Sequence, residues 1–479
     1  MSRKDDPKAS QEPETTPPTV GAVGFISSLV YGATSQLPAP GAGSVGVPLT
    51  ASRSTGRRTI ACMVTHGMGQ QVPFETAASI AEAFVRGRPP QSKPQANRVR
   101  LSTAPDSELV SRMELIYAAQ NGEPETHVHI YEGYWAPLTE GKITYVQALS
   151  FLFSGAWSGI VTTITRKFDR WIFGRMYDLP PKKHTLFILV AVLLVLAAGL
   201  LLAFLCGVEL THFYASLKNL AKQPLLQLPA YLEIIFLTHW RGLIRTALLV
   251  VIAFIYRYFL NLFVIEYLGD VAIYVSSYKV SAFEEIRNAI QKKVVTVGQQ
   301  IFQAADPVTG APLYDGVIFV GHSLGSVVTY DLINALIVWD TQGCSGQHNV
   351  VGRIHRFITF GSPLDKTAFL FRNQTSKDHH YREAMAGLMQ ALVLDYNLRP
   401  FLWVNLFSHA DIVSGALEYY DTPTTSRQLL PNRNPIRSKT DPSAWIPLYA
   451  HIQYWKGKAL SRQLLAGLAP SDVHSNPFP

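Results

Sequence analysis

Cysteine is scarce in this chain of 479 residues, which contains only Cys62, Cys206 and Cys344. They lie far apart, and none stands in a CxxC pattern or at metal-ligand spacing from histidines, so the sequence predicts no zinc or other metal site. The same spacing gives no sign of a disulfide framework, which is typical of a protein in a reducing compartment.

Charged residues are also few. They make up 16% of the chain, whereas hydrophobic residues make up 48%; soluble domains usually contain about 25% charged residues. This composition excludes a chain that is disordered throughout and indicates a globular protein with some membrane-embedded chain. The net charge of +8 is compatible with nucleic acid or an anionic membrane surface. Because we find no nucleic-acid-binding motif, we expect a membrane bilayer as partner and no nucleic acid.

Neither end of the chain has a long apolar stretch. Residues 1–57 are rich in Pro, Gly, Ser and Thr and lack the apolar run of a secretory signal peptide. We expect a disordered N-terminal tail over 1–57 and a flexible C-terminus over 471–479.

Two long apolar segments stand in the middle of the chain. Leu186–Val208 has no charged residue and is long enough to cross a bilayer, which takes about 20 residues. Gly242–Ile265 contains Arg245 and Arg257, which are about 18 Å apart along a helix, so each can reach its own membrane interface. The sequence therefore predicts transmembrane helices near 186–208 and 242–265, within a membrane-associated helical insertion over 141–268.

Basic residues predict the orientation of this insertion. They cluster before the first apolar segment and after the second, and are sparse in the loop 209–241. The positive-inside rule then places both flanks in the cytoplasm of a multi-pass protein of the inner or plasma membrane. A third uncharged segment, Tyr145–Thr165, is expected to lie on the membrane or to line a lipid-facing groove. If it crosses the membrane instead, a fourth crossing is needed, for which Tyr231–Trp240 is the candidate.

Short apolar runs bounded by turn residues predict the strands of an α/β domain. Thr59–Thr65 runs into the glycine-rich turn His66–Gly69, and a helix follows over Phe74–Val85. The other predicted strands are Arg98–Ser102, Arg112–Ala118, His127–Glu132, Gly316–Gly321, Ile358–Phe360 and Phe401–Phe407. Arg112–Ala118 and His127–Glu132 flank Asn121-Gly122, which favours a hairpin.

The most specific motif follows the strand Gly316–Gly321. Residues 321–325 read Gly-His-Ser-Leu-Gly, a match to G-x-S-x-G, and helical periodicity begins at Val327. A strand, a tight turn and a helix are the context that this motif requires to expose a nucleophilic serine. Ser323 is therefore the candidate nucleophile.

This motif resembles the nucleophile elbow of the α/β-hydrolase superfamily, in its lipase and esterase branch. The resemblance implies an α/β-hydrolase fold, a mostly parallel sheet flanked by helices, here interrupted by the helical membrane hairpin. The catalytic domain would consist of residues 58–140 and 269–470. Two features depart from the family: no strand is evident before Thr59 to match its first two strands, and the insertion separates the early strands from the nucleophile.

In this family the acid and then the base follow the serine along the chain. The implied base is His451, which precedes a helical stretch over Ile452–Leu468, and it would take the proton of the serine hydroxyl. The implied acid is Asp411, just past the strand Phe401–Phe407. Asp365, which follows the strand Ile358–Phe360, is the alternative acid, and Asp421 is a weaker third candidate.

The resemblance also implies an oxyanion hole. One amide would come from Leu324 and the other from Gly67 or Met68 in the early glycine-rich turn, where His66 would brace the loop. Together these residues predict a membrane-anchored serine hydrolase that cleaves carboxylic esters, lipid-like ones above all, without a cofactor. A thioesterase or amidase with the same triad, and a non-catalytic membrane scaffold that retains the fold, are the alternatives. The sequence makes no prediction about the oligomeric state.

Overall fold

A computed structural model describes residues 57–142, 281–371, 390–420 and 435–470, each range with gaps, and scattered residues between 147 and 274. The chain divides into Met1–Gly43 and Ser44–Pro479, and every described residue belongs to the second unit. The predicted tails lie outside the described residues, except that Arg57 begins the first strand.

The centre of the described structure is an eight-stranded sheet with the order β10-β9-β8-β7-β1-β4-β3-β2. Neighbouring strands are parallel from β10 to β4, and β3 runs antiparallel to both β4 and β2. The strands are β1 (Arg57–Thr65), β2 (Ala96–Arg100), β3 (Arg112–Tyr117), β4 (Glu125–Gly133), β7 (Gly316–His322), β8 (Ile354–Phe360), β9 (Leu402–Phe407) and β10 (Arg437–Thr440). A mixed α/β architecture with a mostly parallel sheet is thus confirmed, as is the hairpin of β3 and β4.

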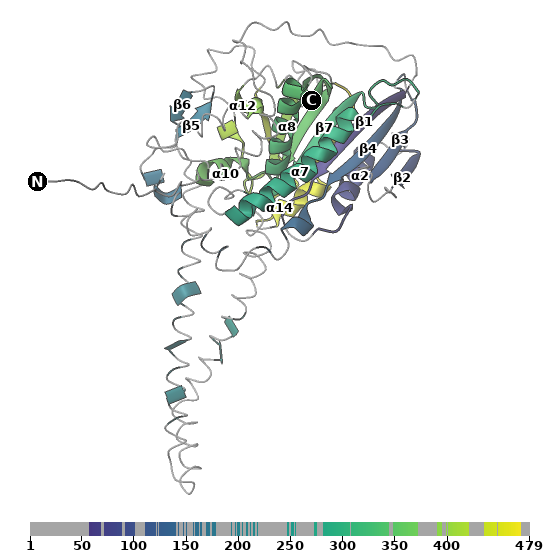
Figure 1. Cartoon of the computed structure of the whole chain (residues 1–479). Coiled ribbons are helices and arrows are strands. Elements are labelled where there is room, and N and C mark those ends of the chain that lie inside the picture. The colour runs from purple at the N-terminus through teal and green to yellow at the C-terminus, as the bar shows by residue number, and fades with distance from the viewer. Residues whose placement is uncertain are drawn as a thin grey trace, which may run out of the picture. The chain divides into compact units, whose positions relative to one another are not determined.

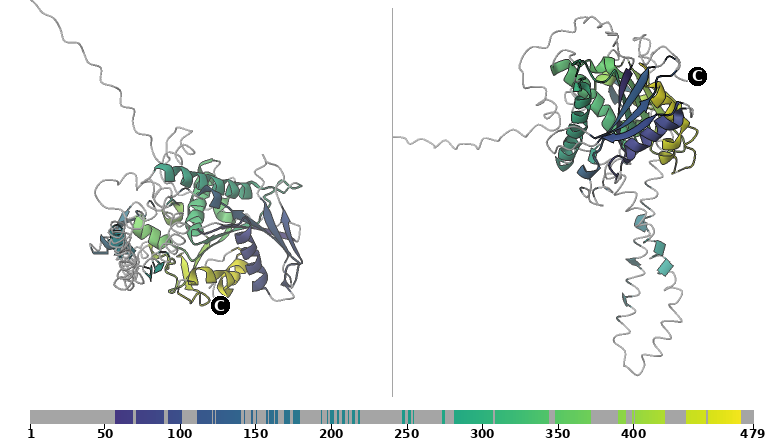
Figure 2. Two further views of the ribbon diagram at one scale, coloured as in Figure 1. Left: turned by 90° about the horizontal axis from the view of Figure 1, so that it is seen from below. Right: turned by 90° about the vertical axis from the view of Figure 1, so that its right-hand side faces the viewer.

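Helices cover both faces of this sheet (Figures 1 and 2). On one face lie α7 (Ser281–Gln303) and α8 (Leu324–Gly343), and on the other lie α2 (Glu75–Gly87) and α15 (Lys458–Ala466). Shorter elements are η2 (Ala136–Leu138), α9 (Val350–Arg353), α10 (Leu364–Phe371), α12 (Ala391–Leu394), η7 (Glu418–Tyr420), α14 (Ala450–Gln453) and η8 (Tyr454–Lys456). A separate hairpin is formed by β5 (Asp169–Ile172) and β6 (Arg175–Asp178).

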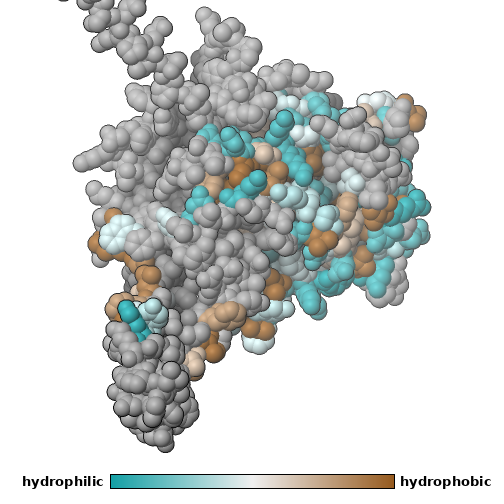
Figure 3. Space-filling model, turned by 60° about the horizontal axis from the view of Figure 1, so that its bottom comes forward, coloured by the Kyte–Doolittle hydropathy of each residue, from teal (hydrophilic) through white to brown (hydrophobic). Residues whose placement is uncertain are grey.

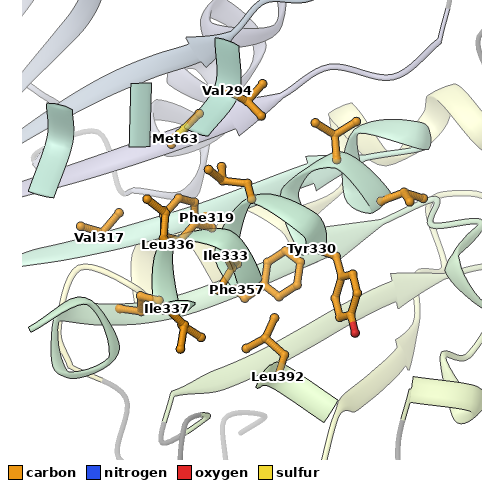
Figure 4. Close-up of a cluster of buried hydrophobic side chains, with 14 of the residues drawn as sticks. Met63, Val294, Val317, Phe319, Tyr330, Ile333, Leu336, Ile337, Phe357 and Leu392 are labelled. Carbon is orange, nitrogen blue, oxygen red and sulfur yellow. The ribbon is translucent and has the colours of Figure 1, made fainter. Parts of the chain in front are cut away.

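The central strands are buried on both faces because their side chains alternate between two cores. In β1, Ala61 and Met63 join the core beneath α7 and α8, while Ile60, Cys62 and Val64 join the core beneath α2 and α15. Figure 4 shows part of the first core, where Phe319 of β7 lies among side chains of α8. This packing fixes the register of the sheet, since a slip of one residue would exchange the two faces.

The strand order explains how β1 can lie inside the sheet although the sequence predicts no strand before it. Among the described residues no strand precedes β1, yet β1 lies in the middle of the sheet. The positions beyond β4 are filled by β3 and β2, which follow β1 along the chain.

The predicted helical stretch over Ile452–Leu468 is helical over most of its length, but it is broken at Gly457. The segment forms α14, η8 and α15, with Gly457 in an extended conformation between the last two. A Cβ atom at Gly457 would lie 2.7 Å from both Asp441 Oδ2 and Ser443 Oγ. The helical path therefore breaks where the chain packs closely against the turn that follows β10.

The predicted membrane hairpin finds no support in the described residues. Among them, no helix has the length and apolar character needed to span a bilayer. Most of 186–208, 242–265 and 145–165, and all of 231–240, lies outside the described residues. Where single positions of the first three segments are described, they are helical, as at Ile160, Leu200 and Val251.

Candidate active site

The register of the sheet brings four strand ends to one edge. Thr65, the last residue of β1, pairs with Gly321 of β7, and the final pair of β7 and β8 is His322 with Phe360. Phe360 in turn pairs with Leu406 of β9. Ser323 and the turn His66–Met68 directly follow two of these strands, and Asp411 lies in the loop after β9. Leu324 and Asp365 lie at the starts of α8 and α10, and His451 lies on α14.

Ser323 lies in a strained turn between β7 and α8. Its backbone has a φ of 52°, a left-handed conformation that is rare for a residue with a side chain. The neighbouring glycines permit this turn: a Cβ atom at Gly321 would lie 2.5 Å from Ser326 Cα, and one at Gly325 would lie 2.3 Å from the Thr65 carbonyl oxygen. The turn required for a nucleophile elbow is therefore present at Ser323.

Two hydrogen bonds connect the candidate nucleophile, base and acid. His451 Nε2 lies 2.8 Å from Ser323 Oγ, and His451 Nδ1 lies 3.0 Å from Asp411 Oδ2. Since the carboxylate can only accept, Nδ1 donates to it and Nε2 is free to accept the proton of the serine hydroxyl. The structure thus brings together three residues that are far apart in the sequence.

Asp411 is held in a tight turn after β9. Its Oδ1 accepts from the Val413 amide at 2.9 Å, and its Oδ2 accepts from the Tyr454 hydroxyl at 3.0 Å as well as from His451. Burial raises the pKa of Asp411, but the hydrogen bond and charge of His451 and the other two donors outweigh it, so its pKa lies below the ordinary value. The carboxylate therefore stays ionised at neutral pH.

The alternative acid, Asp365, has a different place. Its two carboxylate oxygens accept from the backbone amides of Glu418 and Tyr419, at 2.9 and 3.0 Å. It caps the start of η7, and it is Asp411 that bonds to His451. Asp421 lies outside the described residues.

The glycine-rich turn after β1 lies against the nucleophile. A Cβ atom at Gly67 would be 2.9 Å from Ser323 Cβ. The amide of Leu324 is at the first position of α8, where a helix offers it no internal partner. Of the predicted oxyanion residues, Gly67 thus lies against the serine, Leu324 directly follows it, and Met68 directly follows Gly67.

His66 braces this turn. Its Nε2 accepts from the amides of Trp135 and Ala136, at 3.0 and 3.3 Å, so its Nδ1 carries a proton and donates to the Gly67 carbonyl oxygen at 2.8 Å. Burial lowers the pKa of His66 to about 4, which keeps it neutral. In a trans peptide the amide hydrogen points opposite to the carbonyl. By holding the Gly67 carbonyl, His66 therefore sets the direction of the Met68 amide.

Three further residues of the site were not predicted from the sequence. His322 donates from Nε2 to the His451 carbonyl oxygen at 3.0 Å, and burial, followed by the charge of His451, lowers the pKa of His322 to about 3. Lys366 donates to the carbonyl oxygens of Ile412 and Ser414 and so holds the turn that contains Asp411. Burial lowers the pKa of Lys366 to about 8.

The third is Gly361, which has a φ of 60°; a Cβ atom there would lie 3.2 Å from His451 Cε1. Only the position of His322 beside the serine gave any signal in the sequence. Lys366 and Gly361 act through contacts between distant segments.

The described residues contain no group of three or more His, Cys, Asp or Glu side chains placed to hold a metal ion. Cys62 is buried in the sheet, and burial raises the pKa of its thiol, so it is not an activated nucleophile. Comparison with known proteins found no matching family model, no matching curated protein and no matching solved structure. What the chain does must therefore be inferred from its own residues.

Proposed function

We propose that this protein is a serine hydrolase of the α/β-hydrolase fold that cleaves carboxylic esters through an acyl-enzyme intermediate. The observation that supports it best is the chain of hydrogen bonds from Ser323 through His451 to Asp411, at the carboxyl edge of a mostly parallel sheet. The strained turn at Ser323 is a second, independent support, since strain of this kind clusters at functional sites.

In the proposed reaction, each residue of the site has one role. Ser323 Oγ attacks the ester carbonyl carbon while His451 Nε2 takes the hydroxyl proton, and the Asp411 carboxylate stabilises the imidazolium that forms. The amides of Leu324 and Met68 stabilise the negative charge on the carbonyl oxygen. The tetrahedral intermediate collapses as His451 returns the proton to the leaving alcohol. Water, deprotonated by His451, then attacks the acyl-enzyme, and the carboxylic acid leaves with Ser323 restored.

We further propose that the protein is anchored in a membrane by the segments near 186–208 and 242–265, with the catalytic residues on the cytoplasmic side, and that its substrate is lipid-like. The uncharged sequence of Leu186–Val208 supports the anchor. The described side chains of these segments also support it, because Leu200, Phe204 and Phe254 are large, apolar and exposed. A bilayer would cover such side chains.

A fluorophosphonate probe tests the chemistry, because it labels a serine only when that serine is activated. We expect the wild-type protein to be labelled and Ser323→Ala to lose the label. Ser461→Ala is the matched control, since Ser461 is also buried but lies on α15, and it should be labelled like the wild type. Unlabelled wild-type protein, or equal labelling of Ser323→Ala, would refute the proposal. Rates on matched esters, thioesters and amides then identify the bond that is cleaved.

A further inference from the structure

The turns that contain the acid and the base also expose apolar side chains. Ile412, directly after Asp411, is 42% exposed, and Ile452, directly after His451, is 47% exposed. Because Asp411 and His451 are hydrogen-bonded to each other, the turn that contains Ile412 and the short helix α14 that contains Ile452 meet at the site. Isolated exposed apolar residues are common, but two beside a reactive centre call for an explanation.

The segment that leads into α14 extends this apolar surface. Trp445 is 69% exposed and Tyr449 is 52% exposed. The amides of Trp445 and Ile446 both donate to Gln453 Oε1, at 3.0 and 3.1 Å, which holds this segment against the helix that contains His451. We call Ile412, Trp445, Ile446, Tyr449 and Ile452 the apolar rim. Figure 1 labels α14 on the lower side of the α/β domain, and Figure 3, which is turned so that the lower side comes forward, shows hydrophobic side chains at the surface of the described residues.

The composition of the rim fits a lipid surface better than a soluble partner. Trp and Tyr are enriched where proteins meet the bilayer interface, because their rings are apolar and their polar atoms stay hydrated. The sequence from Pro442 to Lys458 contains no acidic residue, and Lys456 and Lys458 in it are exposed. The carboxylates next to the rim in the sequence, Asp411 and Asp441, are buried. Exposed apolar side chains followed by exposed lysines match an anionic bilayer surface in both hydropathy and charge.

A second exposed apolar face has the same character. Trp157, Val161 and Ile164 are exposed at positions described as helical, and their spacing of four and three residues places them on one side of a helix. Ile160, in the same segment, packs against the main core. A helix that packs on the α/β domain with one face and exposes Trp, Val and Ile on the other is typical of a segment lying on a membrane.

We propose that the apolar rim docks the α/β domain on the anionic surface of a lipid bilayer, so that Ser323 takes its ester substrate from the membrane and not from the water. The inference rests on the proposed hydrolase function for the identity of the substrate. The docking itself does not depend on catalysis.

The test uses the full chain reconstituted in vesicles of phosphatidylcholine and phosphatidylglycerol. A Trp445→Ser/Tyr449→Ser variant is compared with the wild type on a short soluble ester and on a long-chain ester dissolved in the bilayer. We expect the ratio of the bilayer rate to the soluble rate to fall at least about tenfold, the effect of losing the burial of one large apolar side chain. Val308→Ser is the matched control, because Val308 is 91% exposed in the turn before β7, at the opposite edge of the sheet. It should leave the ratio unchanged.

A second measurement needs no turnover. Brominated lipid should quench the fluorescence of the wild type more than that of Trp445→Phe, and high salt should reduce the difference. An unchanged rate ratio in the double variant, or equal quenching of the wild type and Trp445→Phe, would overturn the docking. Trp445 shielded from both brominated lipid and aqueous quencher would mean that protein covers the rim, which also overturns it. A wild type inactive on both esters but quenched through Trp445 would refute the hydrolase and leave the docking standing.

Discussion

Single hydroxyls and amides around the triad set its geometry, and Tyr454 is the clearest case. Its hydroxyl donates to Oδ2 of Asp411, the same oxygen that accepts from His451, and it also contacts Ser414 Oγ at 3.2 Å. Tyr454 is fully buried. It touches no reacting atom, so it is a positioning residue that acts through Asp411.

Tyr454→Phe removes this hydroxyl and keeps the ring. The freed lone pair leaves more negative charge on Oδ2, which holds a protonated imidazole more tightly. We nevertheless expect kcat/KM to fall roughly tenfold, because Asp411 loses one of the donors that hold it in position against His451. We also expect the acid limb of its pH profile to move to higher pH. Ester hydrolysis measured from about pH 5 to 9 checks both effects.

The control is Tyr330→Phe, because Tyr330 is also buried and donates its hydroxyl to Gln390 at 2.9 Å. This variant should lose some stability and keep the pH profile of the wild type. Equal rate losses in the two variants, with the acid limb unmoved in both, would mean that Tyr454 has only a packing role.

The three triad candidates could be predicted because each stands in or beside a recognisable local sequence pattern. Ser323 stands in a G-x-S-x-G motif, Asp411 follows a strongly apolar strand, and His451 precedes a helical stretch. No sequence pattern identifies Tyr454, since a tyrosine in that helical stretch could equally be an ordinary core residue. Lys366 and Gly361 contribute only after β8, β9 and α14 have come together. The residues proposed to do the chemistry were thus recognisable in the sequence, whereas the residues that hold them in place were not.

At the scale of elements, the sequence predicted the buried central strands well and missed the polar edge strand β10. β1, β4, β7 and β9 lie within two residues of their predicted bounds because burial on both faces demands continuous apolar sequence. β10 has the sequence Arg-Ser-Lys-Thr and alternates between half-buried and exposed residues at the sheet edge. No apolar pattern in the sequence predicts such a strand. It is extended because it pairs with β9.

α7 was also not predicted, although its sequence contained the signal. Phe283, Ile290, Val294, Val297 and Ile301 are buried, with separations that keep them on one face of a helix. The charged residues between them obscured the pattern. α8 begins at Leu324, three residues before the predicted start, because the strained turn at Ser323 leads directly into the helix.

The turn between β8 and α10 supports a prediction of its own. Gly361 has a φ of 60°, and a Cβ atom there would lie 3.2 Å from both His451 Cε1 and Tyr454 Cε2. Gly361→Ala should displace the imidazole from Ser323 and lower kcat by between about tenfold and a hundredfold, as small misplacements of catalytic groups do. Steady-state hydrolysis of a soluble ester measures the loss.

Gly310 offers a matched control. Its φ is 67°, and a Cβ atom there would meet no atom within 4 Å. Gly310→Ala therefore carries the same kind of backbone strain, about 1 kcal/mol of stability, without contact with the base. If both variants lose the same activity, the loss comes from strain in the fold and the proposed contact with His451 has no role.

At the scale of the whole molecule, the edge of the sheet that contains the proposed triad also contains two buried histidines, His66 and His322. His66 accepts two backbone amides at Nε2. The ring of His322 lies against that of His451, with centroids 5.0 Å apart, and Phe360 and Trp455 lie around it. Burial lowers the pKa of His66 to about 4 and that of His322 to about 3. The unfolded chain, by contrast, protonates histidine near pH 6.5. The residues that build the oxyanion turn and position the base thus make folding sensitive to acid.

The direction in which the free energy of unfolding changes with pH follows from proton binding. Below about pH 6.5 the unfolded state takes up protons that the folded state does not, so the free energy of unfolding falls as the pH falls. For His66 the loss continues to about pH 4 and for His322 to about pH 3. Each histidine contributes about 1.4 kcal/mol per pH unit, so the pair costs about 5 kcal/mol between pH 6.5 and 4.5. That is a large fraction of the stability of an ordinary domain.

Urea unfolding at a series of pH values measures the slope of the free energy of unfolding against pH. The same detergent is used throughout to keep the proposed membrane segments soluble. We expect His66→Gln to reduce the slope between about pH 6.5 and 4.5 by one proton, because the variant has one buried imidazole fewer to protonate on unfolding. Cys62→Ala, which also alters a buried side chain of the sheet region, should lower the stability by a similar amount at every pH and keep the wild-type slope.

A slope that His66→Gln leaves unchanged would mean that His66 is protonated in the folded protein at pH 4.5. Its Nε2 would then have lost the amides of Trp135 and Ala136, and the oxyanion turn would have opened before the domain unfolds.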